Sequence, residues 1–137
     1  MSYVTGVRSD DNKPLNSFAQ GIDGAALETL FLQSVRALNE YNEWGYQIYY
    51  WRTAAGVEVD FILHGPRGFF AFEIKRSTRV NRNDTKGLRA FLQDYPEAQL
   101  YLVHGGEQKY YFDAVEAWPM QAMLLALPTL LGEAKNN

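Results

Sequence analysis

The chain has 137 residues, which is enough for one domain with its own core and too few for two. Hydrophobic residues make up 47% of it, which excludes a wholly disordered chain, and a formal net charge of −3 argues against a general nucleic-acid binder. The sequence contains no cysteine, which excludes disulfide scaffolds and thiolate metal sites and leads us to expect a reducing, cytoplasmic location.

The N-terminal segment, residues 1–22, is polar and mixed in composition. Its stretch "SDDNKPLNS" is typical of a loop or a partly disordered terminus. No signal peptide is visible between Met1 and Ser17, because this part has no apolar core segment. We therefore expect a polar segment over residues 1–22, followed by a single domain over residues 23–137.

A first helix is predicted from about Gly24 to Tyr41. The side chain of Asp23 is of the kind that caps a helix N-terminus. Glu28 lies at the edge of the predicted buried stripe, one turn before Phe31. The apolar positions that keep helical spacing are Leu27, Leu30, Phe31, Val35 and Leu38.

Three strands are predicted next, because aromatic and β-branched residues gather in short runs separated by turn residues. The runs are residues 46–52 ("YQIYYWR"), 57–63 ("VEVDFIL") and 69–76 ("FFAFEIKR"). The turns between them, "AAG" at 54–56 and "HGPRG" at 64–68, are short. We therefore expect an antiparallel meander.

A second helix, over roughly Thr85–Tyr95, and a fourth strand, over Gln99–His104, complete the predicted core. Pro96 ends the helix. The path from the third strand through this helix to the fourth strand is a crossover connection, which places the fourth strand parallel to the third.

The C-terminal part is predicted to add two smaller elements. The segment "KYYFDAVEAWP" is compatible with a short edge hairpin. The apolar run from Met120 to Leu131 contains Pro128 and is too short to span a bilayer, so we expect a terminal helix packed on the domain and no membrane association. The predicted fold class is thus mixed α/β in the order α-β-β-β-α-β, with a mixed four-stranded sheet flanked by helices and a C-terminal helix.

Four charged residues lie inside the second and third predicted strands, which are otherwise apolar: Glu58, Asp60, Glu73 and Lys75. Residues two apart on a strand share a face, so Glu58 goes with Asp60, and Glu73 with Lys75. If the strands pair, Asp60 and Glu73 converge, and two carboxylates about 4 Å apart repel by roughly 4 kcal/mol at a dielectric near 20. A divalent cation, Mg²⁺ or Mn²⁺, reverses that term, and the lysine can orient or deprotonate an attacking water. This set suits hydrolysis of a phosphodiester.

A simpler interpretation of these charges stays open. Glu73 and Lys75 can form a salt bridge on one face of an exposed strand, and Asp60 can pair with Arg52 or Arg76. The apolar flanks of both runs count against it, since a solvated face usually alternates polar and apolar residues more regularly.

A basic stretch follows directly after the third strand. Six basic residues fall within fifteen positions, with Asp84 as the one acid among them: Lys75, Arg76, Arg79, Arg82, Lys86 and Arg89. The stretch can be a solvated loop and helix face, or it can contact phosphates beside the acidic site.

These motifs resemble the PD-(D/E)XK nuclease superfamily. "VEVDFIL" followed by "FFAFEIK" is similar to its pattern, an Asp on the second strand and E-x-K on the third, within a restriction-endonuclease-like αβββαβ core. The longer string from "GAALETLF" through "YYWRTAAGVEVDFIL", "FEIKRS" and "DTKGLRAF" to "YLVHGG" resembles a domain of unknown function that usually follows an AAA-type ATPase module in bacterial and archaeal proteins. The resemblance covers about residues 22–119.

The resemblance implies a role for each matching residue. Asp60 and Glu73 are expected to be metal ligands, with the main-chain carbonyl of Ile74, and Lys75 to position or activate the water. Glu28 is expected to bind the metal or its water, and Glu58 to be an accessory ligand. The residues expected to contact nucleic-acid phosphates are Arg76, Arg79, Arg82, Lys86 and Arg89.

The sequence departs from the family pattern in three places. Val59 stands where a proline is common, and the Q-x-x-x-Y element of RecB-like exonucleases is missing, because Gln93 and Tyr95 are too close. No G-x-x-x-x-G-K-S/T motif is present, so the expected ATPase partner is not part of this chain.

Two functions follow from these features. The first is a Mg²⁺-dependent nuclease that acts on DNA. The second is a catalytically inactive nuclease-like module that binds nucleic acid or a protein partner. The sequence leaves a homo-oligomer open in both cases.

Overall fold

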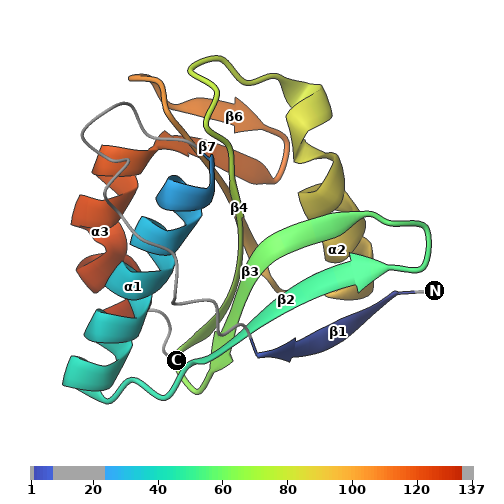
Figure 1. Ribbon diagram of the computed structural model, residues 1–137. Helices are drawn as coiled ribbons and strands as arrows, with labels where there is room; N and C mark the ends of the chain where they lie inside the picture. The colour runs from blue at the N-terminus through green and yellow to red at the C-terminus, as the bar shows by residue number, and fades with distance from the viewer. Residues whose placement is uncertain (1, 8–23, 134–137) are drawn as a thin grey trace.

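The structure is a computed structural model that describes residues 2–7 and 24–133 (Figure 1). The strands, in chain order, are β1 (Ser2–Val7), β2 (Gln47–Thr53), β3 (Glu58–Gly65), β4 (Gly68–Ile74), β5 (Gln99–His104), β6 (Tyr110–Phe112) and β7 (Val115–Pro119). The helices are α1 (Gly24–Asn42), the short 3₁₀ helix η2 (Arg82–Thr85), α2 (Lys86–Asp94) and α3 (Met120–Gly132). The predicted mixed α/β class is confirmed.

The strands form one sheet of seven in the order β1-β2-β3-β4-β5-β7-β6. Strands β1 to β4 pair antiparallel, β4 pairs parallel with β5, and β5 pairs parallel with β7. The predicted meander and the predicted parallel fourth strand are both present. The sheet is wider than the four strands expected, because β1 joins one edge and the β6–β7 hairpin joins the other.

Strand β7 is an internal strand and not part of an edge hairpin alone. It lies between β5 and β6, and its residues Val115 and Ala117 are fully buried. The segment's alternation of buried and half-buried residues is typical of a strand with one face on the core. The free edge of β5 supplies its partner, a tertiary contact that local sequence pattern does not reveal.

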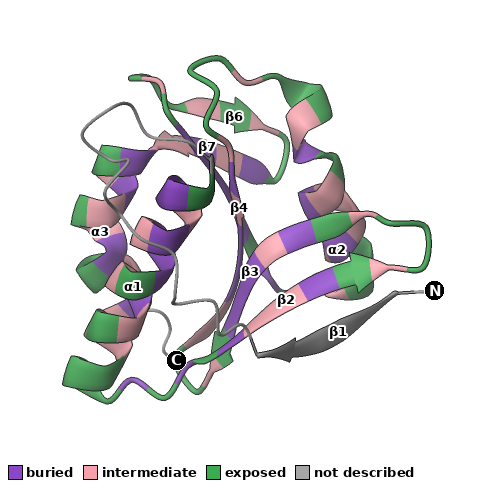
Figure 2. Ribbon diagram, viewed as in Figure 1, coloured by how far each residue is buried: buried purple, intermediate pink, exposed green. Residues whose placement is uncertain are grey.

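The helices cover both faces of the sheet, with α1 and α3 on one side and α2 on the other (Figure 1). The first side holds a large apolar cluster in which α1 and α3 pack on residues such as Phe61, Phe70 and Phe72. The second holds a cluster around Trp51 and Phe91, where α2 packs on the sheet. Figure 2 shows buried residues along the central strands and exposed ones on the outer sides of the helices.

Two element boundaries differ from the expectation. Residues 2–7, expected in a loop or frayed segment, form β1, and the proposed cap Asp23 lies outside the described residues. The second helix begins with η2, because the Asn81 side chain accepts a hydrogen bond from Asn83 N–H while the Asp84 carboxylate accepts one from Asn81 N–H. This capping box starts the helical segment before Thr85.

The terminal helix α3 continues through Pro128 to Gly132. Its last carbonyls are satisfied from outside the helix, since the Tyr46 hydroxyl donates to Leu131 O at 2.6 Å and Arg67 Nη1 donates to Gly132 O at 2.7 Å. Among the described residues, no helix has the length and apolar character needed to cross a membrane.

Candidate functional site

The two acids expected to converge do so where β3 and β4 stop pairing. Phe61 and Phe72 are the last paired residues of the two strands at this end. Beyond them, Ile74 N–H donates to Asp60 Oδ2 at 2.8 Å, and Asp60 N–H donates to Glu73 Oε1 at 3.3 Å. Carboxylates therefore take over the backbone donors that a continued strand ladder would have used. These two hydrogen bonds hold the Asp60 and Glu73 side chains between β3 and β4.

A bulge in β3 lies at the same point. Tyr49 pairs with Ile62, but Trp51 pairs with Val59, so two residues of β3, Asp60 and Phe61, stand opposite one residue of β2. Bulges turn side chains and bend a strand. The bulge breaks the alternation between Val59 and Phe61, which lie in the apolar clusters on opposite faces of the sheet.

Glu58 accordingly differs from Asp60 in its surroundings. Its carboxylate pairs with Arg52 Nη2 at 3.7 Å, and its side chain is 58% exposed. Arg52, one of the two partners considered for Asp60, thus has Glu58 as its ion-pair partner. An exposed pair of this kind contributes little to stability.

Lys75 lies on the same side as Glu73, as the spacing of two predicts. Its Nζ is 3.9 Å from Glu73 Oε2. Its backbone N–H donates to Val103 O at 2.7 Å, which keeps the residue in line with β5 after β4 formally ends. The ammonium group and the two carboxylates therefore belong to one cluster.

The acidity of Glu73 is strongly perturbed. Its pKa is raised to about 8, first by burial, then by the charge of Asp60, with a smaller increase from the charge of Glu28 on α1. Lys75 and the hydrogen bond from Asp60 N–H act in the opposite direction. The structure thus brings Glu28 into electrostatic range of the pair. A cation bound beside these carboxylates would lower this pKa again.

The cluster opens into a cleft of about 500 Å³. One wall is the β2–β3 turn, and the other is η2 with the start of α2. The cleft is lined by Ala55, Gly56, Val57, Glu58, Glu73, Lys75, Asn83, Asp84, Lys86 and Gly87. Gly87 allows the second wall to approach, because a Cβ there would lie 2.3 Å from Glu58 O.

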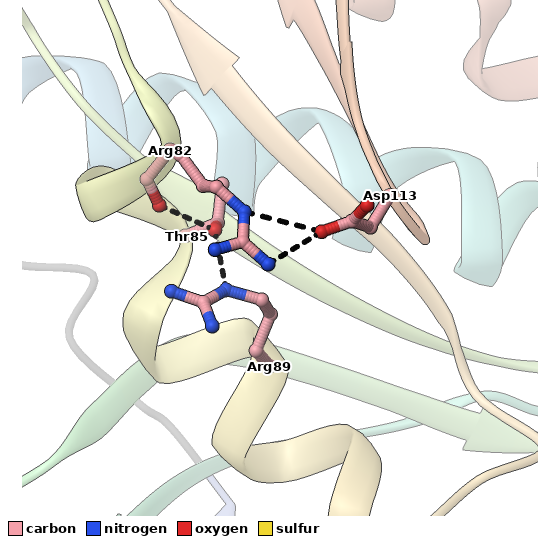
Figure 3. A network of polar contacts seen from close by, with 4 residues as sticks. All are labelled: Arg82, Thr85, Arg89 and Asp113. Atoms are coloured by element: carbon pink, nitrogen blue, oxygen red, sulfur yellow. Dashed lines mark hydrogen bonds and ion pairs between the residues drawn. The ribbon is translucent and has the colours of Figure 1, made fainter.

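The five residues expected to contact phosphates occupy different environments. Lys86 lines the cleft, whereas Arg76 and Arg79 are exposed in the loop after β4. Arg82 donates through Nε and Nη2 to Asp113 Oδ2, at 3.1 and 2.6 Å, and Arg89 Nε donates to Thr85 Oγ1 at 2.9 Å (Figure 3). Two of the five arginine and lysine side chains therefore have partners within the chain.

Asp60 and Glu73 are the two carboxylates placed to hold a divalent cation. Within residues 2–7 and 24–133, no three His, Cys, Asp or Glu side chains gather as a ligand set. Asp60 and Glu73 form a pair, and Mg²⁺ is usually held by one or two carboxylates with several waters and substrate phosphates. The expected contributions of Glu28, Glu58 and the Ile74 carbonyl as ligands stay predictions.

Sequence reasoning missed several residues of the cleft. Asn83, Asp84 and Gly87 were not expected to line it, nor was the turn at residues 55–57. The Asn81-x-x-Asp84 spacing is a capping-box signal and indicates where the helical segment starts. No local pattern indicates that this start lies against the β2–β3 turn.

Comparisons with known proteins assign the chain to a family. The chain is 31% identical over 102 residues to the uncharacterized protein Mb2031c of Mycobacterium bovis (strain ATCC BAA-935 / AF2122/97) and equally to the uncharacterized protein Rv2008c of Mycobacterium tuberculosis (strain ATCC 25618 / H37Rv). Each alignment covers 74% of this chain and 22% of the relative, so the chain spans about a fifth of the length of the curated relatives it matches. Residues 23–123 match the family described as "Domain of unknown function (DUF4143)", and the chain belongs to that family.

Proposed function

We propose that this chain is a nuclease domain of the PD-(D/E)XK type, which hydrolyses phosphodiester bonds of DNA with Mg²⁺ or Mn²⁺. The observation that carries the proposal is the pair of hydrogen bonds that holds the two carboxylates between β3 and β4, from Ile74 N–H to Asp60 and from Asp60 N–H to Glu73. The Lys75 ammonium group lies beside them. The order α1-β2-β3-β4-α2-β5 within the wider sheet also fits a restriction-endonuclease-like core.

The unfavourable electrostatic energy of the Asp60–Glu73 pair supports a functional role. Glu73 is mostly buried beside a second carboxylate, and its pKa of about 8 shows that its charged form is disfavoured near neutral pH. A pair of buried acids that serves structure alone is a poor choice for stability, because an apolar pair would avoid the desolvation. Perturbed acids of this kind gather at functional sites.

The residues divide the proposed work among them. Asp60 and Glu73 would hold the cation, which when bound supplies positive charge at the phosphate and lowers the pKa of a water. The Lys75 ammonium group, 3.9 Å from Glu73, would orient the attacking water and offset charge that develops on the phosphate. Lys86, on the opposite wall of the cleft, would contact a neighbouring phosphate.

The length of the relatives supports a further part of the proposal. Because the chain spans 22% of them, we propose that this domain works next to other modules, an ATPase module among them.

A catalytically inactive binding module is the second candidate. The observation that favours it is the engagement of Arg82 and Arg89 within the chain, which leaves fewer cations for a DNA grip. Fold alone does not decide between an active and an inactive site.

A plasmid-nicking assay separates the two candidates. Supercoiled plasmid is incubated with the purified chain and Mg²⁺ or Mn²⁺, in parallel with the Lys75→Ala variant and an EDTA control. The nuclease proposal expects nicking by the unmodified chain alone. Nicking that persists in either control belongs to a contaminant, and a chain that nicks with neither metal supports the binding module.

A further inference from the structure

The contact between Arg82 and Asp113 joins η2 to the turn of the β6–β7 hairpin. Both side chains are exposed, at 60% and 64%, yet the guanidinium group donates twice to the same carboxylate oxygen (Figure 3). The other side-chain hydrogen bonds described for residues 81–89 lie inside that segment. The pair is thus a tether between the cleft wall and a distant part of the chain.

Asp113 occupies a backbone conformation that favours glycine. Its φ is 56°, in the left-handed region, at the first position of the two-residue turn between β6 and β7. Glycine or asparagine adopts that conformation at lower cost than aspartate. Because aspartate is one of the few residues with a side chain that is common in such turns, the backbone accommodates Asp113 while its carboxylate bonds Arg82.

The tether continues toward the cleft through η2. Thr85, which is fully buried, donates its hydroxyl to Arg82 O at 2.7 Å and accepts from Arg89 Nε at 2.9 Å (Figure 3). Asn83 and Lys86 lie between the members of this network in the sequence, and they line the cleft beside Glu73 and Lys75. Movement of η2 would therefore move the wall that faces the acids.

We propose that Asp113 is a positioning residue, which through Arg82 fixes η2 and so sets Asn83 and Lys86 on the cleft wall for contact with substrate phosphates. The substrate part of this inference rests on the proposed function. Arg82, expected from the sequence to grip DNA, acts in this account as the anchor of the wall. Asp113 itself is not one of the residues that line the cleft.

Hydrogen exchange tests the positioning without any substrate. The variants are Asp113→Asn, which keeps the shape, and Asp113→Gly, which also suits the positive φ; Glu97→Gln removes one exposed acid elsewhere as the control. We expect faster amide exchange at residues 83–87 in both Asp113 variants, with the melting temperature unchanged or slightly raised in Asp113→Gly. Exchange at residues 83–87 equal to that of the control overturns the inference.

A DNA-binding assay tests whether loss of the Asp113 carboxylate weakens or tightens binding. In a Lys75→Ala background with EDTA, a fluorescein-labelled DNA duplex is titrated with each variant. The positioning role predicts binding weakened about three- to tenfold in Asp113→Asn, the range expected when a residue acts through its neighbours. Its salt dependence should be shallower than that of the control, because a displaced Lys86 contacts phosphate less well. If Arg82 gripped DNA directly, removal of Asp113's charge would tighten binding instead, and that result overturns the inference.

The two proposals fail separately. Faster exchange at residues 83–87 without DNA binding by any variant leaves the positioning intact and refutes the proposed function. Nicking by the unmodified chain with unchanged exchange in Asp113→Asn refutes the positioning alone.

Discussion

Phe72 and Glu73 are neighbours in β4, and they illustrate two opposite uses of burial. The Phe72 ring is fully buried, with ring centroids 4.8 Å from Phe31 and 5.4 Å from Tyr101. Glu73 is also largely inside the protein, but burial and the charge of Asp60 disfavour its ionised form. The first residue adds apolar contacts to the core, while the second stores unfavourable electrostatic energy.

The difference shows where the molecule gives up stability. The buried cluster under α1 and α3 is made of hydrophobic residues, which pack against one another. The end of β4 instead carries Glu73, whose ionised form is disfavoured by burial and by Asp60, with the Lys75 ammonium group 3.9 Å away. We interpret this contrast as the boundary between residues that build the fold and residues that serve the site.

Phe72→Ala should give the largest loss of stability. It removes a fully buried ring and leaves a cavity between α1 and the sheet, so the free energy of unfolding should fall by about 3–5 kcal/mol. Urea denaturation measures the change. If the free energy of unfolding fell no more than in a surface substitution, the helices would have to close around the cavity. Phe72 would then not differ from Glu73 in its contribution to stability.

Glu73→Gln should act in the opposite direction, and the sign depends on pH. The folded-state pKa of about 8 lies above the unfolded value of 4.5, so the native state holds an extra proton between these values and stability falls as pH rises through them. The variant lacks this loss, so above pH 8 without divalent cations it should be more stable than the parent by about 1–4 kcal/mol. At pH 4 the two chains should melt alike. Thermal denaturation across this range checks the prediction, and a variant less stable at pH 9 contradicts it.

Gly87→Ala tests how closely the cleft walls must approach. The added methyl group would meet the Glu58 carbonyl oxygen at 2.3 Å, which is backbone and does not move cheaply. We expect a loss of about 1–3 kcal/mol in the free energy of unfolding. Gly56→Ala is a useful comparison, since its Cβ would meet no atom within 4 Å and its cost comes from a φ of 93° alone. Equal effects on nicking would argue against a role for wall spacing.

Arg52→Ala should have the smallest effect. The Arg52–Glu58 pair is exposed on both sides, at 48% and 58%, so its loss should change the free energy of unfolding by less than about 0.5 kcal/mol. Chemical denaturation of this variant and of Glu73→Gln under the same conditions compares the effect of an exposed ion pair on the free energy of unfolding with the effect of the buried acid. A loss as large as that of Gly87→Ala would show that the surface pair is part of the site.

Much of the fold follows from local pattern. Strand β5 has the predicted bounds Gln99–His104, and α1 runs one residue past the predicted end at Tyr41. Both elements have a regular apolar pattern and clear flanking residues, so few other arrangements compete. Strand β1 was not predicted, because it pairs with β2, which is distant in the sequence, and its own residues do not indicate this partner.

The candidate site was predictable in part for the same reason. The spacing of Glu73 and Lys75 and the pairing of adjacent strands were enough to place Asp60, Glu73 and Lys75 together. The bulge at Asp60 depends on how β3 meets β2, and the tether from Arg82 depends on where the β6–β7 turn lies. Both are consequences of tertiary packing, so neither has a signature within a single segment.

Calorimetric titration of Mg²⁺ into the chain at pH 8 tests the central claim most directly, because it asks whether the carboxylate pair binds a dication. The account predicts saturable binding by the parent chain, and binding at least about tenfold weaker in Asp60→Asn, which loses one ligand charge beside Glu73. Absence of binding in the parent, or equal affinity in the variant, would contradict it.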